Sequence, residues 1–241
     1  MGLKNKIAIV TGGSSGYGRG IAEVLKNHGS KVWIIGRFKA KLKKVADELG
    51  VNYIVGDITN PSDWDNIVKT IMKTEKEINI LINNAGGALI SKPLVEHTDE
   101  EVDKTINTNL TGHIYGIIRI GKKMVEQKSG IIINITSVCA DYGWPNKSLY
   151  SAAKAGIEQL DKCLHNEFRK YNVHIVSLTP SWGDTNFLYA NNMPDLPKDV
   201  REKVTKPKEI GDVVAQICMT PDHLVIPKIV IIPMIQEINP M

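Results

Sequence analysis

The feature that most constrains this chain is an apolar segment that ends abruptly in glycines. Residues 7–10 are apolar and mostly β-branched, Gly12, Gly16 and Gly18 follow closely, and helical character resumes at residues 21–26. That order predicts a buried strand, a tight turn and a helix N-terminus. Free N–H groups at a helix start bind phosphate, and glycines let a pyrophosphate approach the backbone. The alternative is a glycine-rich loop without a ligand.

Strand-like and helix-like segments alternate along the whole sequence. Further strands are predicted at residues 31–35, 51–55, 79–82, 131–135, 174–178 and 229–232, and further helices at 40–49, from 61, at 98–125, from about 148 and at 209–219. Parallel strands joined by helices form a doubly wound sheet, so we predict an α/β, Rossmann-type fold with about seven strands. The 241 residues, without a linker, are expected to form a single domain over residues 1–241.

Composition narrows the class of protein. The 30 basic and 26 acidic residues leave a net charge of +4, too small to indicate nucleic-acid binding. Three cysteines without C-x-x-C spacing predict neither disulfides nor zinc, and the six histidines lack ligand spacing, so no metal is expected. No apolar run could span a membrane and no leader precedes residue 7, so we expect a cytoplasmic protein without membrane or nucleic-acid partners.

The end of the second predicted strand distinguishes between the two nicotinamide dinucleotides. A carboxylate there would accept hydrogen bonds from a free 2′-hydroxyl, but this chain has Gly36 followed by Arg37. A guanidinium, together with Lys39 or Lys41, can bind a 2′-phosphate, so NADP is expected and NAD is less favoured. The alternative for Arg37 is an ordinary surface arginine.

Two further strand ends carry candidate contacts to a dinucleotide. Asp57 follows the third strand and can accept a hydrogen bond from the adenine amino group or cap the next helix, while Ile58 can cover the ring. Residues 83–87 (NNAGG) end the fourth strand, where the strand order should reverse. A ligand crevice is therefore expected at this edge of the sheet.

Tyr150 and Lys154 lie four residues apart on a predicted helix, so their side chains share a face. Because an ammonium stabilises a phenolate, we expect Lys154 to lower the pKa of Tyr150. Tyr150 can then act as the general acid in carbonyl reduction and as the base in alcohol oxidation. Ser137, at the end of the fifth strand, can hydrogen-bond the carbonyl oxygen. The alternatives are a structural Tyr–Lys pair and a serine that only forms a turn.

Together these residues resemble the short-chain dehydrogenase/reductase family. Residues 11–18 (TGGSSGYG) are similar to the family's cofactor turn, and residues 83–86 (NNAG) to its strand-four motif. Its catalytic tetrad is matched by Asn109, Ser137, Tyr150 and Lys154. The resemblance extends over nearly the whole chain, with the motifs in the family's order and at its spacings.

The resemblance implies further roles. Lys154 would also hold the nicotinamide ribose, Asn109 would position a water behind Lys154, and Thr185 would fix the nicotinamide carboxamide. It also implies a homo-oligomer, a tetramer or a dimer, built through the helices of Asn109 and Tyr150. The expected cofactor contacts are Gly12, Ser14, Ser15, Gly16, Tyr17, Arg37, Asp57, Ile58, Asn84, Gly86, Tyr150, Lys154, Pro180 and Thr185.

Three positions depart from the family pattern. Ser181 replaces the glycine of a Pro-Gly pair after strand six, Tyr17 replaces an aliphatic residue between glycines, and an Asp-Gly-Gly ending is absent. The ending that is present, from residue 228, is similar to that of a subgroup of NADP-dependent enzymes that act on hydroxy acids such as serine, or on related small carbonyls.

Residues 181–206 are expected to form a lid over the substrate. Bulky side chains from the lid and from the loop before Tyr150 are Trp182, Phe187, Leu188, Tyr189, Tyr142 and Trp144. They indicate an apolar pocket for a ketone or aldehyde, with Ser137, Tyr142, Trp144, Trp182 and Phe187 as substrate contacts. The alternative is that these side chains pack the lid.

The sequence thus predicts an NADP(H)-dependent oxidoreductase that interconverts a small carbonyl compound and a secondary alcohol. A reductase of acyl-carrier 3-oxoacyl thioesters is an alternative, for which Lys198 and Arg201 beside the lid would bind the carrier. A non-catalytic NADP-sensing protein is the alternative outside enzymes.

Overall fold

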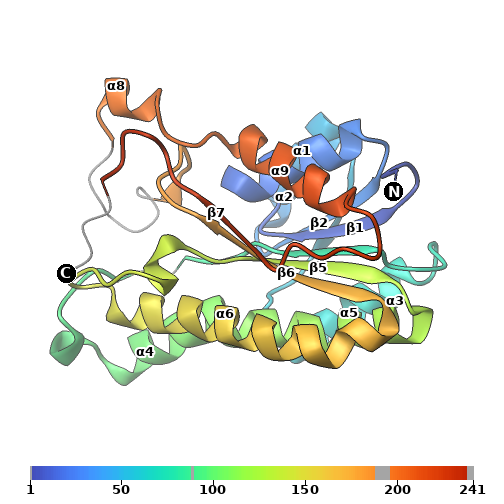
Figure 1. The fold of residues 1–241 in the computed structure, drawn as a ribbon, viewed down its shortest axis with the longest axis horizontal. Coiled ribbons are helices and arrows are strands. Elements are labelled where there is room, and N and C mark those ends of the chain that lie inside the picture. Colours follow the sequence, from blue (N-terminus) through green and yellow to red (C-terminus); the bar gives the residue numbers. More distant parts are fainter. Residues whose placement is uncertain (1, 88–89, 188–195, 238–241) are drawn as a thin grey trace.

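A sheet of seven parallel strands forms the centre of the computed structural model, which describes residues 2–87, 90–187 and 196–237 (Figure 1). The strand order is β3-β2-β1-β4-β5-β6-β7. The strands are β1 Ile7–Thr11, β2 Lys31–Gly36, β3 Asn52–Val55, β4 Ile80–Asn83, β5 Gly130–Ile135, β6 Val173–Pro180 and β7 Lys228–Ile231. This topology confirms the predicted doubly wound, Rossmann-type α/β fold.

Helices cover both faces of the sheet (Figure 1). One layer holds α1 Gly16–Asn27, α2 Lys39–Leu49 and α9 Pro207–Cys218, and the other holds α3 Pro61–Ile71, α4 Asp99–Ile106, α5 Gly112–Gln127 and α6 Ser148–Phe168. Short helical turns lie at η1 Leu94–Glu96, η2 Asn107–Thr111, η3 Val138–Ala140, η4 Arg169–Tyr171 and α8 Lys198–Arg201. The short helix α8 lies within the segment expected to form the lid.

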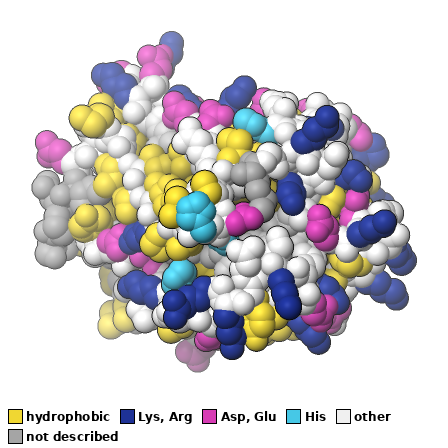
Figure 2. Space-filling view, turned by 45° about the vertical axis from the view of Figure 1, so that its right-hand side comes forward, with side chains coloured by type: hydrophobic (Ala, Val, Ile, Leu, Met, Phe, Trp, Pro, Cys, Tyr) yellow, Lys and Arg dark blue, Asp and Glu magenta, His cyan; other side chains and the backbone are white. Residues whose placement is uncertain are grey.

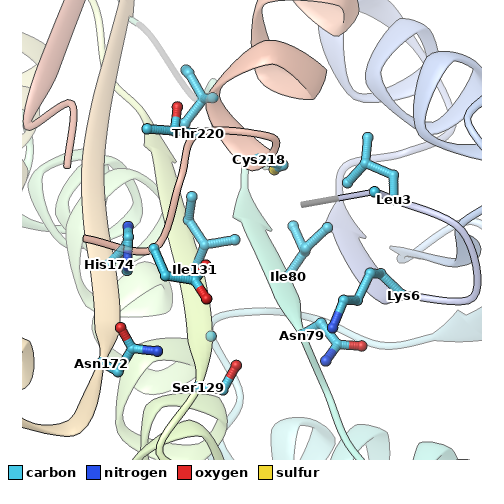
Figure 3. A pocket seen from close by; sticks show the side chains of 14 residues that line it. Leu3, Lys6, Asn79, Ile80, Ser129, Ile131, Asn172, His174, Cys218 and Thr220 are labelled. Carbon is cyan, nitrogen blue, oxygen red and sulfur yellow. The ribbon is translucent and has the colours of Figure 1, made fainter. Parts of the chain in front are cut away.

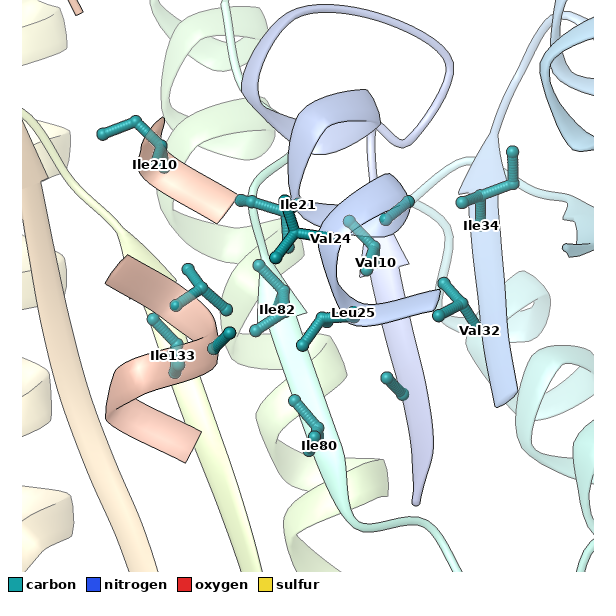
Figure 4. Close-up of a cluster of buried hydrophobic side chains, with 14 of the residues drawn as sticks. Val10, Ile21, Val24, Leu25, Val32, Ile34, Ile80, Ile82, Ile133 and Ile210 are labelled. Atoms are coloured by element: carbon teal, nitrogen blue, oxygen red, sulfur yellow. The ribbon is translucent and has the colours of Figure 1, made fainter. Parts of the chain in front are cut away.

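The central strands β1 and β4 are apolar up to their last residues, because helices cover both of their faces. In β1, Ala8 and Val10 pack in one core with α1, α2 and α9, whereas Ile7 and Ile9 pack in the other with α3 and α5. Figure 4 shows the first core, where Ile21 of α1 and other side chains of that helix lie over the strands. The two cores fix the sheet rigidly beneath the loops at its edges.

The helix expected over residues 98–125 is confirmed as a continuous helical stretch over residues 99–127, in which a π-helical turn, η2, lies between α4 and α5. Within this stretch, the side-chain amide of Asn109 donates to the carbonyl of Thr105 (3.0 Å), one turn earlier. A capping box formed by Thr98 and Glu101 begins α4.

Thr11 joins the two glycine-containing turns at the carboxyl edge of the sheet. Its Oγ1 accepts hydrogen bonds from the backbone N–H groups of Asn84 and Ala85, both at 2.9 Å, and donates to the Ile82 carbonyl at 3.2 Å. The side-chain amide of Asn84 donates to the Thr11 carbonyl at 2.8 Å. The turns after β1 and β4 are thereby held together where the strand order reverses.

The surface carries charges of both signs. Figure 2 shows Lys and Arg side chains interspersed with Asp and Glu over one face of the molecule. Across the ranges that the structure describes, no helix has both the length and the apolar character needed to cross a membrane.

Candidate active site

A cavity of about 1010 Å³ opens at the carboxyl ends of the strands. It brings together eighteen of the residues that the sequence singled out. They are Gly12, Ser14, Ser15, Gly16, Tyr17, Arg37, Asp57, Ile58, Asn84, Gly86, Ser137, Trp144, Tyr150, Lys154, Pro180, Trp182, Thr185 and Phe187. Of the predicted site residues, Asn109 and Tyr142 do not line it.

The start of α1 suits an anion. Ser15 is the N-cap residue, its side chain makes no capping hydrogen bond, and the first turn of α1 carries no acidic side chain. Gly12 has a φ of +65°, and a Cβ there would lie 2.9 Å from Nδ2 of Asn84. The turn therefore requires glycine, and it leaves backbone on the cavity wall where a pyrophosphate of a dinucleotide can bind.

Tyr17, one of the departures from the family pattern, connects α1 to the segment after β6. Its hydroxyl donates a long hydrogen bond to the carbonyl of Ser181 (3.5 Å), and its ring packs on Gly183. Burial raises the pKa of Tyr17. Two of the three departures, Tyr17 and Ser181, are thus in direct contact.

The end of β2 presents cations rather than a carboxylate. Arg37 is 60% exposed, its guanidinium lies 5.5 Å from the ring centroid of Phe38, and Lys41 lines the same cavity. Nη1 of Arg37 is 3.9 Å from a carboxylate oxygen of Asp57, a weak and exposed ion pair. The guanidinium therefore remains available to a 2′-phosphate.

Asp57 is held by its own turn. Its Oδ1 accepts hydrogen bonds from the N–H and the hydroxyl of Thr59, at 2.9 and 2.8 Å. The alternative role as a helix cap is wrong, because Asn60 caps α3 by accepting from the Ser62 N–H at 3.0 Å. Ile58 lines the cavity and is buried, as an adenine contact would be.

The catalytic candidates Tyr150 and Lys154 lie on one face of α6 and are only 7% and 3% exposed. Nζ of Lys154 donates to the carbonyl of Ile135 at 2.8 Å and lies 5.8 Å from the ring centroid of Tyr150. Ser137 directly precedes η3, and its Oγ accepts from the N–H of Cys139 at 3.2 Å. The ends of β5 and α6 thus bring a hydroxyl, a phenol and an ammonium to one wall.

Burial is the largest cause of the pKa shifts of Tyr150 and Lys154. It lowers the pKa of Lys154 to about 8. It raises the pKa of Tyr150, with a smaller contribution from the Cys139 thiol, while hydrogen bonding by Ser137 acts in the opposite direction. The expected lowering of the Tyr150 pKa by Lys154 is therefore wrong in this structure, because desolvation of the phenolate outweighs the attraction of the ammonium.

Asn109 lies behind the cavity wall and is fully buried. Its Oδ1 accepts from the N–H of Gly87 at 3.0 Å, and its Nδ2 donates to the Gly87 carbonyl at 2.6 Å. A Cβ on Gly86 would lie 3.1 Å from Oδ1 of Asn109 and 3.5 Å from Nζ of Lys154. Asn109 therefore holds the turn after β4 against Lys154.

His113 supports the same turn and was not predicted. It is fully buried, and its Nε2 lies 2.7 Å from the carbonyl of Ala85. Burial, together with the charge of Lys154, lowers the pKa of His113 to about 3. The imidazole is therefore neutral at pH 7, and Nε2 carries the proton that it donates to this carbonyl.

Aromatic side chains enclose the substrate end of the cavity. The rings of Tyr150 and Phe187 are 5.9 Å apart, and Trp144 and Trp182 also line the cavity. Tyr142 was expected to touch substrate, but it lies behind Trp144 and meets that ring edge-on at 6.1 Å. Leu188 and Tyr189 lie outside the described residues.

The two basic residues considered for carrier binding do not line the cavity. Lys198 begins α8, and Nη1 of Arg201 lies 3.6 Å from a carboxylate oxygen of Asp184. Several lining residues were not predicted, among them Lys104, Cys139, Lys147 and Gln236. Only Lys147, three residues before Tyr150, could have been suspected from its spacing on the helix.

A second, much smaller cavity of about 50 Å³ lies at the amino ends of the strands (Figure 3). Lys6, Asn79 and His174 are among the residues around it. Oδ1 of Asn79 accepts from the N–H of Ile7 at 2.8 Å. Its size allows a few water molecules but no dinucleotide.

Comparisons with known proteins agree with this geometry. The sequence profile described as short chain dehydrogenase matches residues 6–194. An uncharacterized oxidoreductase of Staphylococcus aureus (strain MW2) is 33% identical over 234 residues, covering 96% of this chain and 98% of that protein.

Two solved structures have the same fold. The closed form of serine dehydrogenase complexed with NADP⁺ is 26% identical, with a TM-score of 0.87 over 98% of each chain. A 3-ketoacyl-(acyl-carrier-protein) reductase from Brucella melitensis complexed with NADH is 25% identical, with a TM-score of 0.87 over 95% of this chain and 97% of that one. Similar folds therefore bind either dinucleotide.

Proposed function

Because the chain belongs to the short-chain dehydrogenase/reductase family, we propose that this oxidoreductase uses NADP(H) to interconvert a small carbonyl compound and a secondary alcohol. The observation that carries the proposal is the placement of Tyr150 and Lys154 in one cavity with the glycine turn of α1. A dinucleotide whose pyrophosphate binds at that turn has room to extend toward Tyr150. When bound, it supplies or accepts the hydride.

In carbonyl reduction, the hydroxyl of Tyr150 donates its proton to the carbonyl oxygen, and the hydroxyl of Ser137 donates a hydrogen bond to that oxygen as negative charge develops on it. The raised pKa of Tyr150 keeps the phenol protonated at pH 7, which favours its use as an acid. Lys154 adds positive charge beside the phenol and, by the family resemblance, holds the nicotinamide ribose. Asn109 and His113 position the turn against which Lys154 lies.

The preference for NADP rests on the end of β2. Gly36 leaves no carboxylate to repel a 2′-phosphate, and Arg37 and Lys41 offer two cations on the same wall. Arg37→Asp should lower kcat/KM for NADPH by about 10- to 100-fold, because it removes a charge-assisted contact and adds repulsion. The same variant should leave kcat/KM for NADH unchanged or increased. Equal losses with both cofactors would contradict this role of Arg37.

We expect the chain to act as a homo-oligomer, a tetramer or a dimer. β7 is an edge strand, and Val230, Ile232 and Met234 are exposed on it and just beyond it. An exposed apolar edge is the kind of surface that a second copy covers. Sedimentation equilibrium on the purified chain tests this, and a monomer at micromolar concentration would contradict it.

A panel of ketones, aldehydes and alcohols, followed by nicotinamide absorbance with NADP(H) and NAD(H) in parallel, tests the proposed reaction. We expect turnover of at least one carbonyl–alcohol pair, faster with NADP(H). The NADP-sensing alternative predicts tight NADPH binding without turnover of any member of the panel. The acyl-carrier alternative predicts activity that depends on Lys198 and Arg201, so both charge reversals should then abolish turnover of a carrier thioester.

A further inference from the structure

Lys147 is a cation at the substrate end of the cavity that lies outside the Tyr150–Lys154 pair and has no acidic partner among the described residues. Lys147 lines the cavity, directly precedes α6, and lies three residues before Tyr150 on the same side of the helix. Its Nζ is 6.0 Å from the ring centroid of Trp144. It forms no ion pair within residues 2–87, 90–187 and 196–237.

The acidic side chains near this end are already paired. Asp141 accepts two hydrogen bonds from Lys228, at 2.7 and 2.6 Å, and Asp184 is bound by Lys206 at 2.9 Å, and neither acid lines the cavity. Among the described lining residues the one acid is Asp57, which lies beside Arg37 at the adenosine end. The charge of Lys147 is therefore uncompensated where the substrate binds.

Lys147 lines the same cavity as Ser137 and Cys139. Burial raises the pKa of the Cys139 thiol, and the charges of Lys147 and Lys154 act in the opposite direction. Cys139 lies on η3, two residues after Ser137, whose Oγ accepts its backbone N–H. Lys147 therefore shares the cavity with the group that would hold the carbonyl oxygen.

Gln236 gives this part of the cavity another donor. It is only 8% exposed, and its Oε1 accepts from the hydroxyl of Ser181 at 2.6 Å and from the N–H of Trp182 at 3.2 Å. Because a backbone N–H can only donate, the atom that accepts it is the amide oxygen. Nε2, a donor, is left for a ligand, so the polar groups that Lys147 and Gln236 offer both favour an acceptor.

We propose that the substrate carries a carboxylate, that Lys147 binds this carboxylate, and that the reaction interconverts an oxo acid and a hydroxy acid. The inference rests on the proposed carbonyl–alcohol reaction and names its substrate class. In reduction, the carbonyl carbon accepts a hydride from the reduced nicotinamide, which is oxidised, and the carbonyl oxygen accepts the proton of Tyr150. The carboxylate is unchanged, and solvent returns a proton to Tyr150.

A carboxylate carries a negative charge and only accepts hydrogen bonds, so it can pair with the ammonium of Lys147 and accept a hydrogen bond from Gln236. The test compares 2-, 3- and 4-oxo acids with their methyl esters, which lack the charge, and with a phosphorylated ketone. Each compound is assayed with NADPH and four full-length proteins. These are the unmodified chain and the variants Lys147→Met, Lys147→Arg and Lys162→Met. Lys162 is the matched control, because it is exposed on the outer side of the same helix.

We expect the unmodified chain to prefer one oxo acid over its ester and over the phosphorylated ketone. Lys147→Met should lower kcat/KM for the acid by about 10- to 100-fold, mainly through KM, and leave kcat/KM for the ester within about twofold. Lys147→Arg should retain most of the activity on the acid, and Lys162→Met all of it.

Equal activity on acid and ester in the unmodified chain would overturn the inference, as would an equal loss on both in Lys147→Met. A preference for the phosphorylated ketone would show that the site binds a phosphate, and it would overturn the proposal that Lys147 binds a carboxylate. Turnover of neutral ketones without turnover of any oxo acid would overturn only this inference. If no carbonyl compound of any kind were reduced, the proposed function would fail instead.

Discussion

The two ends of the same parallel strands serve different purposes. At the carboxyl ends a cavity of about 1010 Å³ is lined by glycine turns, whereas a cavity at the amino ends is about 50 Å³. Gly12 and Gly86 keep the first end open, because a Cβ at either would reach its neighbours within 2.9 to 3.1 Å. The difference indicates that the candidate ligand site lies at the carboxyl ends, where the strands are followed by glycine turns that expose backbone.

The two ends differ in the polar groups that they bury. At the amino ends, the side-chain amide of Gln127 accepts from the Ile78 N–H at 3.1 Å and donates to the Ile78 carbonyl at 2.9 Å. At the carboxyl ends, Tyr150 and Lys154 are buried at a cost that appears in their shifted pKa values. Titratable groups with shifted pKa values in a cavity are typical of catalytic sites. Backbone groups with hydrogen-bond partners, as at Ile78, are typical of purely structural regions.

The largest contrast should come from removing one hydroxyl at either end. Tyr150→Phe should lower kcat by about 1000-fold or more, because the substrate oxygen loses its proton donor. Tyr171→Phe makes the same change in η4, at the amino ends, and should leave kcat unchanged. The dissociation constant of NADPH should stay within about threefold in both variants. Comparable losses of kcat in the two would break the comparison.

Adding a methyl group at Gly12 tests whether the backbone of the turn after β1 binds the dinucleotide. Gly12→Ala should weaken NADPH binding by about 10- to 100-fold, because a φ of +65° strains alanine and its Cβ would displace Asn84. Gly2→Ala places the same methyl group beside the small cavity, where nothing lies within 4 Å. That control should bind NADPH normally, as titration of nicotinamide fluorescence would measure. Normal binding by Gly12→Ala would contradict the backbone cradle.

The smallest effect is expected in the pH dependence. Since burial lowers the pKa of Lys154 to about 8, kcat/KM for reduction should fall several-fold as pH rises through 8, when the ammonium loses its proton. Stability should change in the opposite direction. Between pH 8 and the ordinary lysine value of 10.5, the unfolded chain binds more protons, so the free energy of unfolding rises with pH. A rate that is constant to pH 10 would contradict this assignment.

The fold could be predicted because it depends on local patterns. The apolar run of β1 and the glycines after it determine a strand, a turn and a helix without reference to the rest of the chain. The π-helical turn at η2 could not be predicted, because the hydrogen bonds of Asn109 to Gly87 join residues far apart in sequence. Local propensity alone would continue the helix through Asn109.

The site was predictable to the same extent. The spacing of Tyr150 and Lys154 gives their shared face, but not the desolvation that decides the pKa of each. Tyr142 was misplaced, because neighbouring aromatic residues in a loop can point in different directions. Gln236 was missed, because only the folded C-terminal segment brings it to Ser181.

Transfer of a labelled hydride tests the central claim most directly. NADPH dideuterated at nicotinamide C4 is incubated with the chain and a carbonyl substrate from the panel, and the alcohol is examined by mass spectrometry. We expect one deuterium on the carbinol carbon, and none with Tyr150→Phe over the same time. Oxidation of the cofactor without deuterium in the alcohol, or labelled alcohol formed equally fast by Tyr150→Phe, would contradict hydride transfer beside Tyr150.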